Sequence, residues 1–224
     1  MGVDEESEME LVEFAAALPD KLFDFIILET CFSAGIELAY ELKDKADYIL
    51  GSSAEIVSPG FRPIYSGYMN YLFTKETGLA GFAEQAFEWV SSQSGIYQSG
   101  TLSLIRTSAL PALATWLSSH ISETDLSDQL EDIQHFDRYT YRLFFDLEDY
   151  YSRLVDENDR ETLSRLIADC LIYKAATSSF MDSYAYRGFV INQHSGFTTY
   201  ILQNEFPYLN EQYQQMSWYK AVYR

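Results

Sequence analysis

The chain has 224 residues, of which 47% are hydrophobic and 16% are aromatic, so it can bury the core of one large or two small domains. Its formal net charge is −19, because 34 acidic residues face only 15 basic ones. Phosphate backbones are bound by clustered Lys and Arg, so this charge argues against a nucleic-acid partner and favours basic partners or substrates. Solubility is the simpler explanation for most of the charge.

Two cysteines, Cys31 and Cys170, are too few for a disulfide framework, and neither lies in a zinc-type Cys/His spacing. We therefore expect no structural metal. The N-terminus is acidic where a signal peptide would be basic and then apolar, and no apolar run is long enough to span a membrane. Because processing of a precursor can remove an export signal, this does not settle the compartment.

The first predicted elements form a β-α-β unit. The capping box Ser7-x-x-Glu10 predicts a short helix over 8–18. The compact apolar run 23–28 is typical of a buried strand, a helical pattern begins at Ile36, and 47–51 is the next strand. Strands joined in this way are parallel, which indicates an α/β fold.

Helical patterns dominate the rest of the chain, with one alternating strand at 101–106. Two late strands are predicted at 188–191 and 197–202, on either side of a turn. The helical patterns cover 64–74, 80–93, 108–121, 126–154, 159–176 and 207–223. We predict a division near residue 125, with the candidate nucleophile in 1–125 and a mostly helical region, with the late strands, in 126–224.

Glu29, Thr30 and Cys31 follow at the carboxyl end of the first predicted strand. In open parallel sheets reactive groups collect at the carboxyl ends of strands, and a helix beginning just after the cysteine would favour the thiolate and offer N–H groups to an oxyanion. The alternative is that Cys31 is a small core residue, and on the pattern alone that alternative is slightly favoured. Cys170 lies on an apolar helical face and is expected to be an inert core thiol.

A cysteine nucleophile also needs a base, usually a histidine. The chain has three histidines. His120 and His135 lie in helical patterns, where they are most simply surface or helix-end residues. His194 lies in the turn between the late strands, but nothing in the sequence directs it toward Cys31.

The stretch 23–42 resembles the nucleophile segment of the clostripain family of cysteine peptidases. It contains an apolar strand, then Glu29-Thr30-Cys31, and then the helical core Ile36-Glu37-Leu38-Ala39-Tyr40. The resemblance continues through 46–50, Ala54-Glu55-Ile56, 173–177 and 195–197 to 217–222, and so covers almost the whole chain.

The resemblance implies a caspase-like α/β/α sandwich and a Cys-His dyad in which Cys31 is the nucleophile. It also implies cleavage of polypeptides after Arg or Lys, and a secreted or cell-envelope bacterial protein. The family's histidine belongs to a segment upstream of the nucleophile, and no histidine precedes Cys31 here. We therefore expect the histidine to come from an upstream segment or light chain, with early strands of the sheet absent from this chain and the isolated chain inactive. The alternative is a non-catalytic pseudo-peptidase or interaction protein, and a truncated gene product would have the same sequence.

Two departures from the family's pattern concern the substrate pocket. The acid two residues before the cysteine is Glu29 rather than Asp; it can still pair with a substrate cation, or it is simply a solvated acid at a strand end. Pro59 stands where relatives often carry a second acid, which weakens the implied selection for basic residues. Ser52 and Ser53 are expected to line the pocket as polar walls.

No cofactor is expected. Calcium dependence occurs in the family, but no ligand cluster in the sequence requires it. The aromatic residues at 136–151 and 206–223 indicate packing between helices and sheet, although an aromatic platform for a ligand such as a carbohydrate is an alternative.

Overall fold

A mixed four-stranded sheet forms the centre of the protein. The computed structural model describes residues 3–4, 7–74, 76–122, 124 and 126–223. The strand order is β3-β4-β5-β7, with β3 parallel to β4 and the other pairs antiparallel. The bounds of these strands are β3 Phe23–Ile27, β4 Ala46–Gly51, β5 Thr101–Arg106 and β7 Leu171–Ala176.

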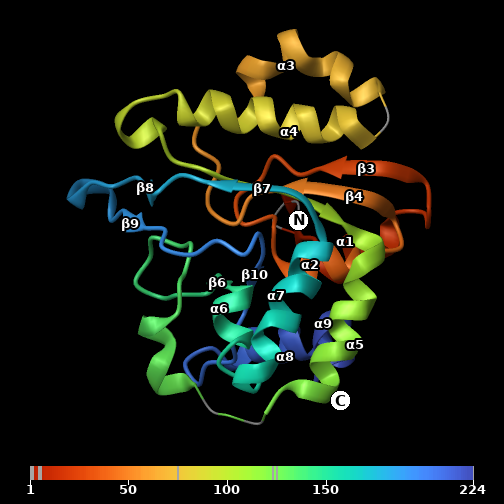
Figure 1. Cartoon of the computed structure of the whole chain (residues 1–224), viewed down its shortest axis with the longest axis vertical. Coiled ribbons are helices and arrows are strands. Elements are labelled where there is room, and N and C mark those ends of the chain that lie inside the picture. The colour runs from red at the N-terminus through yellow and green to blue at the C-terminus, as the bar shows by residue number, and fades with distance from the viewer. Residues whose placement is uncertain (1–2, 5–6, 75, 123, 125, 224) are drawn as a thin grey trace.

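Helices cover both faces of this sheet (Figure 1). One face is covered by α3 (Arg62–Tyr68) and α4 (Glu76–Ser91). The other face is covered by α1 (Leu11–Ala17), α2 (Ile36–Glu41), α5 (Leu110–His120), α7 (Arg160–Asp169) and α9 (Ser217–Val222). The predicted α/β/α sandwich is therefore confirmed.

The alternation of side chains along the strands builds two cores. On β4, Ile49 faces the side of α2 and α5, whereas its neighbour Leu50 faces α4. On β5, Ile105 and Leu104 divide in the same way. A sheet covered on both faces favours continuous apolar runs, as predicted for β3; β5, predicted from its alternation, also has both faces covered, and its Thr101 and Ser103 are buried as well.

Short elements complete the chain. The remaining strands pair in twos: β1 Val3–Asp4 with β2 Ser7–Glu8, β6 Phe145–Asp146 with β10 Thr198–Thr199, and β8 Ser179–Phe180 with β9 Phe189–Val190. The remaining α-helices are α6 Leu147–Tyr151 and α8 Pro207–Gln215. The 3-10 turns are η1 Met69–Phe73, η2 Gly95–Tyr97, η3 Thr107–Ala109, η4 Ser127–Asp132, η5 Glu157–Asp159 and η6 Tyr184–Tyr186.

Several sequence-based boundaries were wrong. The range 126–154, predicted as one helix, contains η4, an irregular segment, β6 and the short helix α6. Of the range 159–176, predicted as one helix, only the part up to Asp169 is helical, and 171–176 is the strand β7. A short apolar run is compatible with either a strand or a helix, and here pairing with β5 makes it a strand. The C-terminal helix is interrupted at Met216, whose backbone is extended.

The N-terminal helix also begins later than predicted. Its capping box is formed by Glu10 and Glu13, and Ser7, expected as the cap, lies in β2. The division near residue 125 falls outside the described residues and stays a prediction. The larger core nevertheless combines residues from both sides of that point, including Leu117 and Tyr151. None of the described helices is long and apolar enough to cross a membrane.

Candidate functional site

Cys31 lies in the turn that leads from the carboxyl end of β3 to α2, and its side chain is exposed. The next residue, Phe32, has φ 57°, a left-handed conformation that costs a residue with a Cβ about 1–2 kcal/mol. A hydrogen bond of 3.0 Å from Phe32 N–H to the Ala54 carbonyl helps to hold it. The turn is therefore fixed in a strained shape that presents the thiol to solvent.

Ser33 connects this turn to the loop after β4. Its Oγ donates to the Thr30 carbonyl at 2.8 Å and accepts the Ser52 N–H at 3.0 Å. Gly51 is required here, because a Cβ at that position would lie 2.8 Å from the Ser33 carbonyl oxygen. The two loops thus pack backbone to backbone.

The backbone donor at the sulfur comes from the second loop. Ile56 N–H donates to Cys31 Sγ at 3.3 Å. α2 begins at Ile36, where the helical pattern predicted it. The N–H groups of Phe32 and Ala34, which lie between the cysteine and this helix, donate to the carbonyls of Ala54 and Ser52 and are therefore not free for an oxyanion. The 52–57 loop supplies the group that the helix was expected to supply.

An ion pair that the sequence did not reveal holds this loop. Arg138 forms a two-point pair with Glu55, with Nη2 at 3.0 Å from Oε1, and also donates to the Tyr186 carbonyl at 2.7 Å. The hydrogen bonds that Arg138 donates to Glu55 raise the pKa of Arg138. Cys31 is close enough to raise this pKa further through electrostatic attraction. The only sequence signal was the segment Ala54-Glu55-Ile56, which carried the resemblance without a role.

An aromatic stack also braces the nucleophile turn. The rings of Phe32 and Phe144 are parallel, with centroids 4.0 Å apart. The segment of Phe144 is held by Asp137, whose Oδ2 accepts the N–H groups of Leu143 and Phe144 at 2.7 and 2.9 Å. Burial raises the pKa of Asp137.

Glu29 has both carboxylate oxygens engaged. They accept the Phe61 N–H at 2.6 Å and the Tyr65 hydroxyl at 2.9 Å. Burial, with help from Glu29, raises the pKa of Tyr65 to about 12, so this hydroxyl stays a donor. Gly60 has φ 64°, and any Cβ there would collide with Glu29 Oε1. The carboxylate therefore lies directly behind the turn at Gly60.

Ser52 and Ser53 lie in different surroundings. Ser52 lines a cavity of about 30 Å³ together with Gly60 and Trp89, and its Oγ lies 2.9 Å from Thr101 Oγ1. Ser53 is fully buried, and its Oγ lies 3.1 Å from His194 Nε2. With a volume of about 30 Å³, this cavity is much smaller than an ordinary small-molecule site.

Each histidine is engaged away from Cys31. Burial lowers the pKa of His194 to about 3 and that of His135 to about 4, so both are neutral at neutral pH. His135 Nδ1 lies 3.0 Å from the Asp137 carbonyl, and exposed His120 lies at the end of α5 with Nδ1 2.7 Å from the Trp116 carbonyl. His194 lies beside the site, but its ring contacts the Ser53 hydroxyl and not the thiol of Cys31.

Cys170 is fully buried at the end of α7, as expected for a core thiol. Burial raises its pKa to about 12, and its Sγ donates to the Leu166 carbonyl at 3.3 Å. Among the described residues, no three His, Cys, Asp or Glu side chains are grouped so that they could hold a metal ion.

Solved structures resemble this chain over nearly its whole length. An inactive zymogen C11 protease from Parabacteroides distasonis is 32% identical, with a TM-score of 0.84, over 96% of this chain and 63% of its own. A B. fragilis cysteine protease is 26% identical, with a TM-score of 0.85, over 100% and 97%. A clostripain from Bacteroides thetaiotaomicron, in complex with the peptide inhibitor BTN-VLTK-AOMK, is 25% identical, with a TM-score of 0.81, over 99% and 97%.

The α/β/α sandwich and its structural neighbours define the fold as that of a caspase-like cysteine protease. The exposed thiol of Cys31 lies at a strand end of this fold. The model of the clostripain family matches residues 1–221, and the chain belongs to this family. No curated protein matches the chain. The chain spans 63% of the Parabacteroides protein, so it corresponds to only part of that relative.

Proposed function

We propose that this chain is the cysteine-bearing part of an endopeptidase that cleaves polypeptides after Lys or Arg, with Cys31 as its nucleophile. The observation that supports this most directly is the exposed thiol on a strained turn, with the Ile56 N–H at its sulfur. In such a reaction the thiolate attacks the scissile carbonyl, the amine leaves with a proton, and water hydrolyses the thioester.

The base in this mechanism is a histidine from a segment upstream of Met1. The three histidines of this chain are engaged with Trp116, Asp137 and Ser53. β3 is the outermost strand of the sheet, with β4 on one side and no strand on its other side among the described residues. A strand of the upstream segment can pair with this edge, which would place its end beside the carboxyl end of β3 and so near Cys31.

The preference for basic residues rests on three features. Glu29 lies directly behind Gly60 of the cavity near Cys31, the net charge of −19 attracts cations, and the inhibitor bound to the Bacteroides thetaiotaomicron neighbour carries the sequence VLTK. The cavity must enlarge to admit Lys or Arg, since it now holds about 30 Å³. With Pro59 in place of a second acid, selection against uncharged residues is weaker than in a pocket with two carboxylates.

The proposed setting is outside the bacterial cytoplasm. A neighbour with 26% identity is described as a secreted C11 cysteine protease from Bacteroides thetaiotaomicron, and the chain covers 61% of it. No cofactor and no calcium ion take part in the proposed reaction.

The test uses this chain produced together with its upstream segment and peptides that differ only in the residue before the cleaved bond. We expect cleavage after Lys and Arg, at least tenfold slower cleavage after Gln, and none with Cys31→Ala. Cys170→Ala is the matched control and should keep its activity. Equal cleavage after Gln would overturn the specificity alone, whereas activity in Cys31→Ala would overturn the nucleophile.

A non-catalytic role is the second candidate, and the engagement of all three histidines away from Cys31 favours it. It predicts no cleavage of any of these peptides by the assembled protein. An upstream segment without a histidine would also support it.

A further inference from the structure

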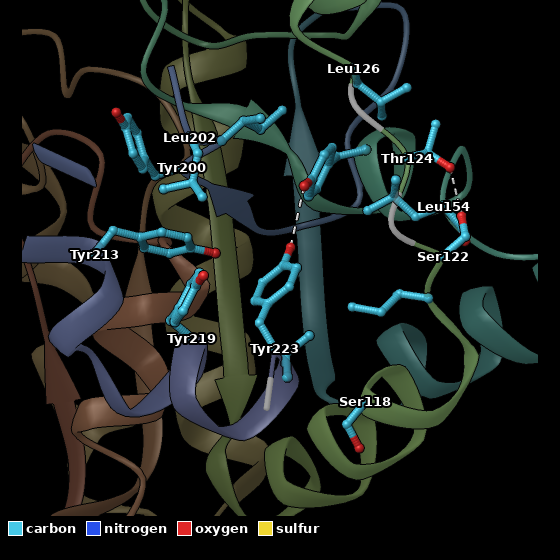
Figure 2. A pocket seen from close by; sticks show the side chains of 14 residues that line it. Ser118, Ser122, Thr124, Leu126, Leu154, Tyr200, Leu202, Tyr213, Tyr219 and Tyr223 are labelled. Carbon is cyan, nitrogen blue, oxygen red and sulfur yellow. Dashed lines mark hydrogen bonds between the residues drawn. The ribbon is translucent and has the colours of Figure 1, made fainter. Parts of the chain in front are cut away.

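Two groups of tyrosines in this chain differ in their surroundings. In the first group, Tyr150 and Tyr223 have their hydroxyl oxygens 3.3 Å apart, and the Tyr200 hydroxyl donates to Asn210 at 2.7 Å. Figure 2 shows the cavity of about 540 Å³ that these tyrosines line. Their hydroxyls are hydrogen-bonded within the protein, so this group holds the helical part of the chain together.

Tyr139, Tyr184 and Tyr186 form the second group, which faces solvent. Tyr184 is fully exposed, and Tyr139 and Tyr186 are 62% and 45% exposed. Tyr184–Tyr186 is the turn η6 at the tip of the β8–β9 hairpin, and in Figure 1 this hairpin extends beyond the end of the sheet. Single exposed apolar residues are ordinary, whereas exposed aromatic residues gathered at one place are typical of an interaction surface.

These three tyrosines gather at Arg138, and we call them the Arg138 patch. Arg138 Nη1 donates to the Tyr186 carbonyl at 2.7 Å, and Tyr184 lies two residues away in the same turn. Tyr139 follows Arg138 in the chain, and it lies close enough to help to raise the pKa of that guanidinium. Two segments that are distant in sequence thus present their rings around one side chain.

The Arg138 patch is fixed beside the nucleophile turn. Arg138 pairs with Glu55, and the next residue, Ile56, donates its N–H to Cys31 Sγ at 3.3 Å.

A small apolar core gives the hairpin a second attachment to the same loop. It contains Ala54 of the 52–57 loop, Phe136 and Phe180 of β8, and Phe189 of β9 packs against it. The rings of Phe180 and Phe189 are stacked with centroids 5.5 Å apart. A polypeptide bound at Cys31 therefore finds the patch at a fixed place outside the cavity near Cys31.

The charged groups at the patch come in opposite pairs. Glu55 pairs with Arg138 at two points, and in the tip 182–187 Asp182 is balanced by Arg187. A charged side chain gains little at such a place, although the whole chain carries a net charge of −19. Tyrosine rings offer a large apolar contact area and lose little conformational entropy on binding. The chemistry of the patch therefore suits a large apolar side chain.

We propose that the Arg138 patch is a second recognition surface for the substrate polypeptide, which takes a large apolar side chain away from the cleaved bond. This inference rests on the proposed function and deepens it, because the polypeptide would be selected by an apolar residue as well as by the Lys or Arg before the cleaved bond.

The test uses the chain assembled with its upstream segment and a series of Gly/Ser peptides with one Lys. A single Phe is placed at each of several positions on either side of the Lys, and a peptide with Ser at the same position is its control. At one or two positions we expect Phe to lower KM about fivefold without a change in kcat. Fluorescence anisotropy of labelled peptides on the assembled Cys31→Ala protein should show the same gain in affinity without turnover.

Three variants locate the effect. Tyr139→Ala, Tyr184→Ala and Tyr186→Ala should each raise KM for the best Phe peptide toward the value of its Ser control, and Tyr186→Ala keeps the backbone carbonyl that Arg138 uses. Because all three side chains are exposed, the urea midpoint should not change. Tyr208→Ala is the matched control, since Tyr208 is similarly exposed but lies on α8.

Equal KM for Phe and Ser peptides at every position would overturn the patch and leave the proposed cleavage after Lys in place. A larger gain from a second Lys than from Phe would overturn the apolar occupant. Loss of co-purification in the tyrosine variants would assign the patch to the upstream segment and overturn its role in substrate binding. If no peptide is cleaved, the proposed function fails, and anisotropy with the Cys31→Ala protein still decides whether the patch prefers Phe.

Discussion

The position of Cys31 was visible in the sequence, but its environment was not. A strand-like run followed by Cys31 and small residues is a local pattern, and the structure places the thiol there, exposed. The groups around the thiol come from residues that are distant in the chain: Ile56, Arg138 and Phe144. Neither periodicity nor spacing in the sequence predicts these contacts, because only tertiary packing brings the residues together. Of the predicted pocket residues, Ser52 lines the small cavity, while Glu29 lies behind its wall and Ser53 is buried on His194.

The two thiols should differ sharply in reactivity. In the native chain we expect iodoacetamide at pH 8 to modify Cys31 and to spare Cys170, because Cys170 is fully buried and burial raises its pKa to about 12. Mass spectrometry of tryptic peptides checks this. In denaturant both should react, and a native Cys31→Ala chain should take up no label.

His194 should make the protein acid-sensitive. Burial holds its folded pKa at about 3, well below the usual 6.5, so below pH 6.5 the unfolded chain binds a proton that the folded chain refuses. Stability from this group is full above pH 6.5 and falls as the pH drops toward 3, by at most about 3 kcal/mol at pH 4. In urea titrations at pH 7 and pH 4, His194→Gln should lose less stability on acidification than the native chain. An identical loss in both proteins would show that His194 is not neutral and buried.

At the scale of elements, the β3-α2-β4 unit was predictable because apolar runs and a helical pattern alternate over a short stretch. β7 was not, since the run 171–176 becomes a strand only through its pairing with β5. The apolar residues of 126–146 have helical spacing in the sequence, but they do not form one face of a helix. They make separate local contacts instead, such as the stack of Phe144 on Phe32.

Glu37 connects α2 with the end of β10 and the residue after it. Its Oε1 accepts both the Thr199 hydroxyl at 2.8 Å and the Tyr200 N–H at 2.9 Å, and burial raises its pKa. Glu37→Ala would leave both donors without an acceptor and should cost about 2–4 kcal/mol in the free energy of unfolding. Glu37→Gln keeps an acceptor oxygen and should cost less than about 1 kcal/mol in the same urea titration. Equal losses for the two variants would mean that the negative charge, which both remove, matters rather than the acceptor oxygen, which glutamine keeps.

The Glu55–Arg138 pair should hold the 52–57 loop in the position where Ile56 donates to the thiol. Arg138→Gln removes the two-point pair, so we expect iodoacetamide to modify Cys31 several-fold more slowly as the donor becomes mobile. Arg153→Gln is the matched control, because Arg153 pairs with Asp149 away from Cys31. Unchanged alkylation in Arg138→Gln would show that the loop does not need this pair.

At the scale of the whole molecule, the sheet leaves β3 as an outer strand beside the nucleophile turn, and no histidine of the chain bonds to the thiol among the described contacts. Family membership supplies the class of protein, and the proposed upstream segment would supply both the missing strand pairing and the base. The net charge of −19 is the whole-molecule feature behind the proposed preference for substrates that carry Lys or Arg.

The central claim is that Cys31 is a nucleophile completed by a histidine from that upstream segment. The most direct measurement is mass spectrometry of the co-purified segment and chain after treatment with an arginyl chloromethylketone. We expect one adduct on Cys31 and none on Cys170, and loss of the adduct when the histidine of the upstream segment is replaced by alanine. No adduct on the assembled protein, or an adduct that persists without that histidine, would contradict the account.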